Sequence, residues 1–304
     1  MTVLTSIADL ILALTLSPLL IGLINRTKAK FAGRKGQPLL QPYYDLVKLM
    51  KKGSVYSTTS TWIFRLGPVT GLASVLLAIT IVPHGKIGGV LSFAGDFVFM
   101  AYLLGLGRFA TAIAALDTGS AFEGMGASRE IQLAVLAEIV LLLVLAVLAI
   151  GTGEISLTGI YAKLWDKTAS SLGPGVLPVA FAFSIILLTE NARIPVDDPN
   201  THLELTMIHE VMVLDHGGID LAFIQYGAAL KLWLFAALLT GLVIPFRSGV
   251  FYLDIPVNTA GIFSTAILIG IIESGMARLR LLYVPQMLIV ALAVTLASLL
   301  WILR

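Results

Sequence analysis

Eight apolar runs follow one another along the chain, each long enough or nearly long enough to cross a bilayer as a helix. A spanning helix needs about 20 mostly apolar residues, and only helices and closed barrels satisfy their backbone in lipid. Barrel strands would alternate apolar and polar residues, and these runs do not. The predicted spans are Val3–Ile24, Gly67–Val82, Phe97–Leu116, Ile131–Ile150, Val176–Thr189, Leu221–Ile244, Val257–Ile272 and Tyr283–Ile302. The pattern predicts an all-α polytopic membrane protein with about eight transmembrane helices.

A further helix is predicted between the first two spans, at Pro42–Lys52. Its apolar residues recur at helical spacing and its charged residues lie elsewhere, as in an amphipathic helix at the level of the lipid headgroups. We find no repeat and no second soluble region. One membrane domain is therefore expected over residues 1–304.

Composition and charge support a lipid-facing surface. Of the 304 residues, 58% are hydrophobic and 12% charged, and the mean hydropathy is +0.95, whereas soluble domains carry roughly 25% charged residues. Most Lys and Arg residues fall on one side of the predicted spans, chiefly in 26–65. The positive-inside rule therefore predicts cytoplasmic main loops, external termini and a location in the cell membrane. The first run lacks a basic segment before it and a cleavage site after it, and is expected to be retained.

The chain contains no cysteine, so it has no disulfide and no cysteine-ligated zinc or iron–sulfur cluster of its own. A net charge of +2 gives no reason to expect a nucleic-acid partner.

Several ionisable residues fall inside or at the ends of the predicted spans. Each such group costs about 2.5–3.5 kcal/mol at a helix centre, so membrane proteins keep few without a role. These residues are Arg108, Asp117, Glu130, Glu138, Glu190, Lys231 and Glu273. They indicate either a proton or charge relay or an interior set of ion pairs, for example Arg108 with Glu138. Glu190 and Glu273 also allow an interfacial position, where their charge would cost little.

The segment after the fifth span is rich in acids and histidines. His202, His209 and Glu210 allow a metal-site hypothesis, but no paired motif such as HExxH is present, and the pattern argues against a metal. Prolines at 195 and 199 predict a helix end followed by a new start, with Thr201 and Glu204 forming a capping box.

Motifs spread over the whole chain resemble those of the complex I subunit 1 family. The stretch Asp117–Glu130 (DTGSAFEGMGASRE) is similar to the hydrogenase-type branch, found in the membrane subunit of formate hydrogenlyase and other energy-converting NiFe-hydrogenases. Glu190–Asp197 (ENARIPVD) resembles the ExxxxPFD element of the respiratory branch. Glu273 with the basic residues of 276–280 is similar to the last cytoplasmic loop of the family.

The sequence departs from the respiratory branch after Asp197. Respiratory members run LPEAExEL there, whereas this chain has Asn200 and His202 where two of the usual acids stand. In respiratory relatives this loop helps to line a quinone cavity, so the departure argues against an ordinary quinone site.

The resemblance implies a membrane-anchor and coupling subunit of an energy-converting hydrogenase-like complex. Its implied partners are an iron–sulfur small subunit, a hydrogenase-like large subunit and antiporter-like membrane subunits, all beside the lipid bilayer. Iron–sulfur clusters and any NiFe site would belong to those partners, with no cofactor, metal or complete active site in this chain. The implied proton or charge relay comprises Glu130, Glu138, Glu190, Glu204 and Glu273, tuned by Arg108 and Lys231. The implied docking residues for the soluble arm are Arg34, Lys35, Asp45, Lys48, Asp117, Arg129, Arg193, Asp197 and Glu210.

Three alternatives remain open at this point. One is a quinone-site subunit of an NADH dehydrogenase-like complex, which shares the fold. Another is a stand-alone ion transporter, although such proteins often show internal repeats. The third is a membrane metalloenzyme using the histidines of the segment after the fifth span.

Overall fold

The computed structural model describes residues 2–84, 87–166, 172–198, 207–245, 248 and 251–303. Within this part of the chain all regular structure is helical. Seven helices are long and apolar enough to cross a membrane. They are α1 (Thr2–Phe31), α3 (Trp62–Ile79), α4 (Asp96–Asp117), α5 (Ala121–Thr152), α8 (Gly218–Val243), α9 (Phe251–Gly275) and α10 (Val284–Leu303). The shorter elements are α2 (Gln41–Met50), α6 (Leu157–Lys163), α7 (Val176–Glu190) and the 3-10 turns Gly173–Gly175, Glu210–Val213 and Leu281–Tyr283.

The predicted polytopic all-α fold is confirmed, and each of the eight apolar runs falls on a helix. Three helices extend well beyond the apolar runs. α5 begins at Ala121 instead of Ile131, because the glycine-rich motif is itself helical, and α1 continues through the basic residues to Phe31. α9 begins at Phe251 instead of Val257. Hydropathy marks only the part of a helix that lies in lipid.

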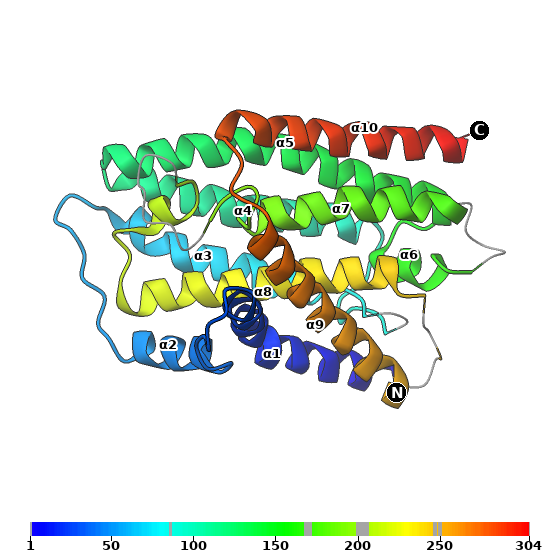
Figure 1. Cartoon of the computed structure of the whole chain (residues 1–304), viewed down its shortest axis with the longest axis horizontal. Helices are drawn as coiled ribbons and strands as arrows, with labels where there is room; N and C mark the ends of the chain where they lie inside the picture. Colours follow the sequence, from blue (N-terminus) through cyan, green and yellow to red (C-terminus); the bar gives the residue numbers. More distant parts are fainter. Residues whose placement is uncertain are drawn as a thin grey trace.

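Helix α8 forms the centre of the bundle. It packs against α1, α3, α7 and α9, and 72% of its spanning window is buried, against 22–44% for the other six long helices. Figure 1 shows α8 running between α1 and α9 on one side and α7 on the other. A charged side chain on α8 is therefore enclosed by protein.

Helix α7 is too short to cross the hydrocarbon alone. Its 15 residues rise about 22 Å, whereas the hydrocarbon is about 30 Å thick. It ends at Glu190, and the chain then turns back through Ala192, whose φ of 48° is left-handed. The early end of α7 leaves Glu190 within the protein and not at its surface.

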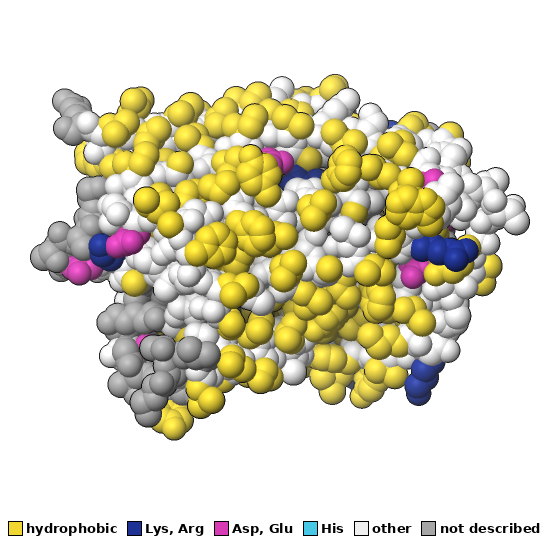
Figure 2. Space-filling model, turned by 180° about the vertical axis from the view of Figure 1, so that it is seen from behind, with side chains coloured by type: hydrophobic (Ala, Val, Ile, Leu, Met, Phe, Trp, Pro, Cys, Tyr) yellow, Lys and Arg dark blue, Asp and Glu magenta, His cyan; other side chains and the backbone are white. Residues whose placement is uncertain are grey.

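The two ends of the bundle differ. The C-terminal part of α1, α2, the starts of α3, α5 and α8, and the segment after α7 gather at one end, here called the loop-rich end (Figure 1). Between the ends, the face in Figure 2 is mostly hydrophobic, and charged side chains gather toward the ends apart from one small central group. This distribution suits a protein whose sides face lipid.

Candidate functional site

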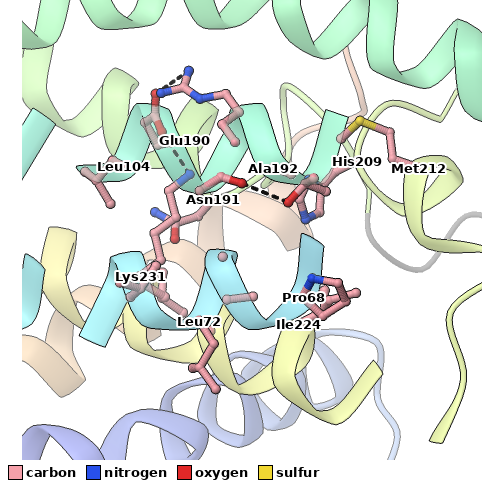
Figure 3. Close-up of a pocket in the computed structure, with 18 of the residues that line it drawn as sticks. Pro68, Leu72, Leu104, Glu190, Asn191, Ala192, His209, Met212, Ile224 and Lys231 are labelled. Atoms are coloured by element: carbon pink, nitrogen blue, oxygen red, sulfur yellow. Dashed lines mark hydrogen bonds and ion pairs between the residues drawn. The ribbon is translucent and has the colours of Figure 1, made fainter. Parts of the chain in front are cut away.

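A buried carboxylate lies between two cations at the end of α7. Glu190 Oε1 lies 3.2 Å from Arg108 Nη1 of α4, and Glu190 Oε2 lies 2.9 Å from Lys231 Nζ of α8. The Glu190 side chain is 2% exposed. Figure 3 shows the side chains of Glu190 and Lys231 pointing toward each other beside a cavity. Glu190 is therefore enclosed by protein, almost without contact with solvent.

The position of Glu190 explains why it needs two cations. The C-terminal end of a helix carries a partial negative charge, which disfavours an acid in its last turn. Burial adds a desolvation cost, because a carboxylate loses its water on entering the protein. Arg108 and Lys231 offset both costs, and they do so from two different helices. The ion pair thereby ties α4, α7 and α8 together.

Two further acids lie near Arg108. Glu130 and Glu138 of α5 are within electrostatic range of its guanidinium, and the Glu138 carboxylate lies beside Gly105 of α4. The suggested ion pair of Arg108 with Glu138 is wrong, because Arg108 pairs with Glu190 instead. We call Arg108, Glu130, Glu138, Glu190 and Lys231 the Glu190 cluster. It holds two cations and three carboxylates, one acid more than base.

A second buried carboxylate lies near the end of α9. Glu273 Oε2 is 2.8 Å from Lys28 Nζ of α1, and Glu273 Oε1 is 3.5 Å from Arg193 Nη1. The Glu273 side chain is fully buried. Arg193 follows α7 closely in the chain. We call Glu273, Lys28 and Arg193 the Glu273 cluster. Through Arg193 it lies next to the Glu190 cluster.

Asp197 organises the segment after α7. Its carboxylate accepts backbone hydrogen bonds from Ile208 at 3.1 Å and His209 at 3.0 Å, and it lies 2.9 Å from Arg278 Nη2. The residue is 2% exposed. One acid thus fixes the segment before α8 to the loop after α9.

Two cavities adjoin these clusters. One, of about 120 Å³, is lined by Arg108, Glu130, Glu190, Lys231 and apolar residues of α3 and α8. The other, of about 510 Å³, lies between α1, α2 and α8 and reaches Asp197 and Glu210. Asn191, Arg193 and His209 line both. The short turn after α7 therefore forms the wall between them.

The expected docking residues fall into exposed and buried groups. Arg34, Lys35 and Lys48 are exposed at the loop-rich end. Most of the other residues of the set stabilise the fold through hydrogen bonds and ion pairs. Asp117 accepts from the Thr61 backbone and hydroxyl, Asp45 accepts from Gln41, and Arg129 donates to the Met207 carbonyl. Arg193 and Asp197 are buried in ion pairs, and Glu210 is partly exposed at the start of its 3-10 turn.

The capping-box residues Thr201 and Glu204, with His202, lie outside the described residues. Among the residues that are described, no group of three or more His, Asp or Glu side chains is arranged to hold a metal ion.

The sequence and fold comparisons now decide the family. The family model described as NADH dehydrogenase matches residues 4–303. Formate hydrogenlyase subunit 4 of Escherichia coli is 31% identical over 293 residues, covering 94% of each chain. Hydrogenase-4 component C of the same organism is 31% identical over 306 residues, covering 99% of this chain and 95% of the relative. The chain belongs to the complex I subunit 1 family.

More distant matches agree with this assignment. An NADH-quinone oxidoreductase membrane subunit of Koribacter versatilis is 28% identical over 178 residues, covering 55% of this chain and 42% of the relative. A chain of the archaeal membrane-bound sulfane sulfur reductase shares the fold, with a TM-score of 0.81 at 20% identity over 98% of this chain and 99% of that one. This family member is thus a multi-pass membrane subunit of a respiratory-type complex, more similar in sequence to the formate hydrogenlyase and hydrogenase-4 proteins than to the Koribacter oxidoreductase.

The structure also brings together residues of this family member that the sequence did not single out. His216, just before α8, stacks on Phe64 at the start of α3, with ring centroids 3.9 Å apart. Glu123 of the glycine-rich motif accepts from the Asp215 backbone at 3.2 Å. A lone histidine and a lone acid in separate loops give no sequence signal for such contacts.

The Glu190 ion pairs predict a large effect of removing the acid. Replacing Glu190 by Gln leaves Arg108 and Lys231 buried without their shared carboxylate, which should destabilise the protein by about 3 kcal/mol. Thermal unfolding in detergent measures this. The control is Glu154→Gln, which breaks a partly exposed pair with Lys163 and should cost about 0–1 kcal/mol. Equal losses in both variants would contradict the argument.

His216 predicts a pH-dependent stability. Burial lowers the pKa of His216, while Asp220 and Asp215 oppose that shift. The folded state therefore favours the neutral imidazole, so its contribution is present above the unfolded pKa of about 6.5 and is lost as the pH falls below it. Thermal unfolding at pH 7.5 and pH 5.5 should show a smaller acid-induced loss in His216→Gln than in the wild type. An unchanged loss would exclude His216 as its source.

Proposed function

We propose that this chain is the membrane-anchor and coupling subunit of an energy-converting hydrogenase-like complex of the formate hydrogenlyase or hydrogenase-4 type. It docks an iron–sulfur soluble arm at the loop-rich end and relays protons or charge toward antiporter-like membrane subunits. Sequence identity to formate hydrogenlyase subunit 4 over nearly the whole chain and the excess acid in the Glu190 cluster support this proposal. The loop-rich end faces the cytoplasm of a cell membrane.

Docking is supported by the exposed basic residues of the loop-rich end. Arg34 and Lys35 follow α1, and Lys48 lies on α2. Positive side chains steer and orient a partner that carries complementary acids. The buried members of the docking set, Asp197 above all, shape this surface from beneath. The iron–sulfur clusters and any NiFe site belong to the docked subunits.

The relay is supported by the imbalance in the Glu190 cluster. Both cations pair with Glu190, so Glu130 and Glu138 have no ion-pair partner among the described residues. Arg193 lines both cavities and pairs with Glu273, so movement of the turn after α7 would act on both clusters. Redox-linked motion of the docked arm would reach them through that turn. Glu204 completes the proposed relay from the segment before His209.

The quinone-site subunit is a second candidate because of the larger cavity. Its volume of about 510 Å³ is within the range of small-molecule sites, and it opens between α1, α2 and α8. Quinone retained in the purified complex, together with inhibition by quinone-site compounds, would favour this candidate over the hydrogenase-type subunit.

The relay predicts a separation of redox activity from ion pumping. In proteoliposomes of the whole complex, Glu138→Gln should keep electron transfer in the soluble arm and lose most ion pumping. We choose Glu138 because none of the ion pairs of the described residues includes it, so its loss disturbs the structure least. Electron transfer and the pH gradient are measured on the same preparation. The control Glu154→Gln should keep both, and full pumping by Glu138→Gln would remove Glu138 from the relay.

The docking surface predicts loss of the soluble arm on charge reversal. Arg34→Glu combined with Lys35→Glu should weaken retention of the iron–sulfur subunit by the membrane part, most strongly at low salt, because salt screens exposed charges. Co-purification of the subunits at low and high salt measures this. Lys163→Glu reverses a charge on α6, away from the loop-rich end, and this variant should retain the arm. If retention is the same in the wild type and both variants, these two residues take no part in docking.

A further inference from the structure

The chain folds back into the bundle after α3, on the side of α8 away from the Glu190 cluster. His84 and Ile87 pair in both directions, with N–O distances of 2.9 and 3.0 Å, and the Leu91 amide donates to Thr80 at 3.0 Å. Ile81, Val82 and His84 are all buried. Non-helical backbone at membrane depth is tolerated only where protein encloses it or water reaches it. The paired segments Thr80–His84 and Ile87–Leu91, here called the hairpin, are thus enclosed by protein around His84, whereas Val90 and Leu91 are exposed.

Neighbouring helices fix this hairpin. The Ser6 hydroxyl of α1 donates to the Gly88 carbonyl at 2.7 Å, and the Gly89 amide donates to the Thr158 hydroxyl of α6 at 3.2 Å. Gly89 also packs against the backbone at Ile81, where a Cβ would lie 2.3 Å from its carbonyl oxygen. The position of His84 is therefore set by three parts of the chain.

His84 meets an acid of α1. His84 Nδ1 lies 2.6 Å from Asp9 Oδ2, and the two residues are 5% and 8% exposed. An ionised carboxylate at this depth is costly unless a proton or cation lies beside it. The contact is an ion pair when the imidazole carries its second proton. Asp9 is therefore placed to stabilise a protonated His84.

The other nitrogen of His84 is also buried. Nε2 has no hydrogen-bond partner among the described residues, and neither has Nε1 of Trp233 on α8. The two rings lie 6.2 Å apart by their centroids. A buried histidine usually has its second nitrogen fixed by a partner, which sets the tautomer. Here neither ring nitrogen makes a hydrogen bond to the described residues, so no such partner fixes the tautomer.

The remaining charged groups around this region are engaged elsewhere. Asp96 accepts from the Leu157 amide at 2.7 Å, Glu154 pairs with Lys163, and Asp254 accepts from Ser248. Lys86 lies outside the described residues. Among those described, Asp9 is the charged partner of His84.

We propose that Asp9 and His84 form a second proton-binding site, distinct from the Glu190 cluster. The neutral imidazole keeps one proton on Nδ1, beside Asp9 Oδ2, and the site takes up a second proton at Nε2 from water at the end of the bundle opposite the loop-rich end and returns it there. Binding converts the neutral imidazole into an imidazolium beside the carboxylate, and release reverses this. The proposal does not depend on the redox partner of the complex.

The test follows the protonation of His84 in the full chain. The protein is labelled with ¹⁵N-histidine and reconstituted into liposomes with one orientation. Only four histidines are present, and His84→Asn identifies the signals of this one. The pH is then lowered on one side of the membrane at a time. We expect the two ring-nitrogen signals of His84 to converge, as in an imidazolium, when the side opposite the loop-rich end is acidified.

Two variants decide whether the pair binds a proton or only holds the hairpin. Asp9→Asn keeps the shape of the side chain but removes its charge, and should abolish the response of the His84 signals to acidification. Ser6→Ala removes a hydrogen bond to the same hairpin and should leave the response intact. The proposal is overturned if His84 does not respond to that side, if Asp9→Asn leaves the response unchanged, or if Ser6→Ala abolishes it as well.

Discussion

The buried carboxylate of Glu190 is the constraint on which the membrane part of the site depends. An acid at the C-terminal end of a helix, almost without solvent exposure, is held there by charges that two other helices supply. Arg108 must come from α4 and Lys231 from α8, so these helices cannot shift past α7 without exposing an unpaired charge. Packing between apolar side chains alone would allow these helices to pack against one another in several registers, shifted along their axes. The ion pairs select one of these registers.

At the loop-rich end acidic side chains also stabilise the arrangement of the chain, but there their partners are backbone groups. Asp197 binds two amides of the segment before α8, and Asp117 binds Thr61 at the start of α3. Irregular backbone next to a membrane needs such partners because it lacks helical hydrogen bonds. Acidic residues of the family motifs therefore stabilise the backbone that carries the exposed basic residues. Their substitution would distort this surface.

The sequence was sufficient to predict the helices, but it did not predict how deeply their charged side chains are buried in the protein. Apolar runs predict where a helix meets lipid, and all eight fall on helices. The burial of Glu190 could not be foreseen, because hydropathy does not report that α7 is short and enclosed by protein. The Arg108–Glu138 pairing failed because sequence does not fix the rotation of α4 against α5 and α7. His84 and Asp9 gave no signal, since they lie far apart in the chain and meet only through a folded-back hairpin.

Helix α8 relates the two proposed proton sites. Lys231 and Trp233 are two positions apart, and successive helical residues turn by about 100°, so these side chains leave the helix in nearly opposite directions. Lys231 points to the Glu190 cluster, and Trp233 lies by the imidazole of His84. Leu232 between them is 1% exposed. The two sites thus lie at similar depth on opposite faces of one helix, separated by buried apolar groups. The two proposed sites therefore have no polar connection through Leu232 of α8, and each would exchange protons by its own route.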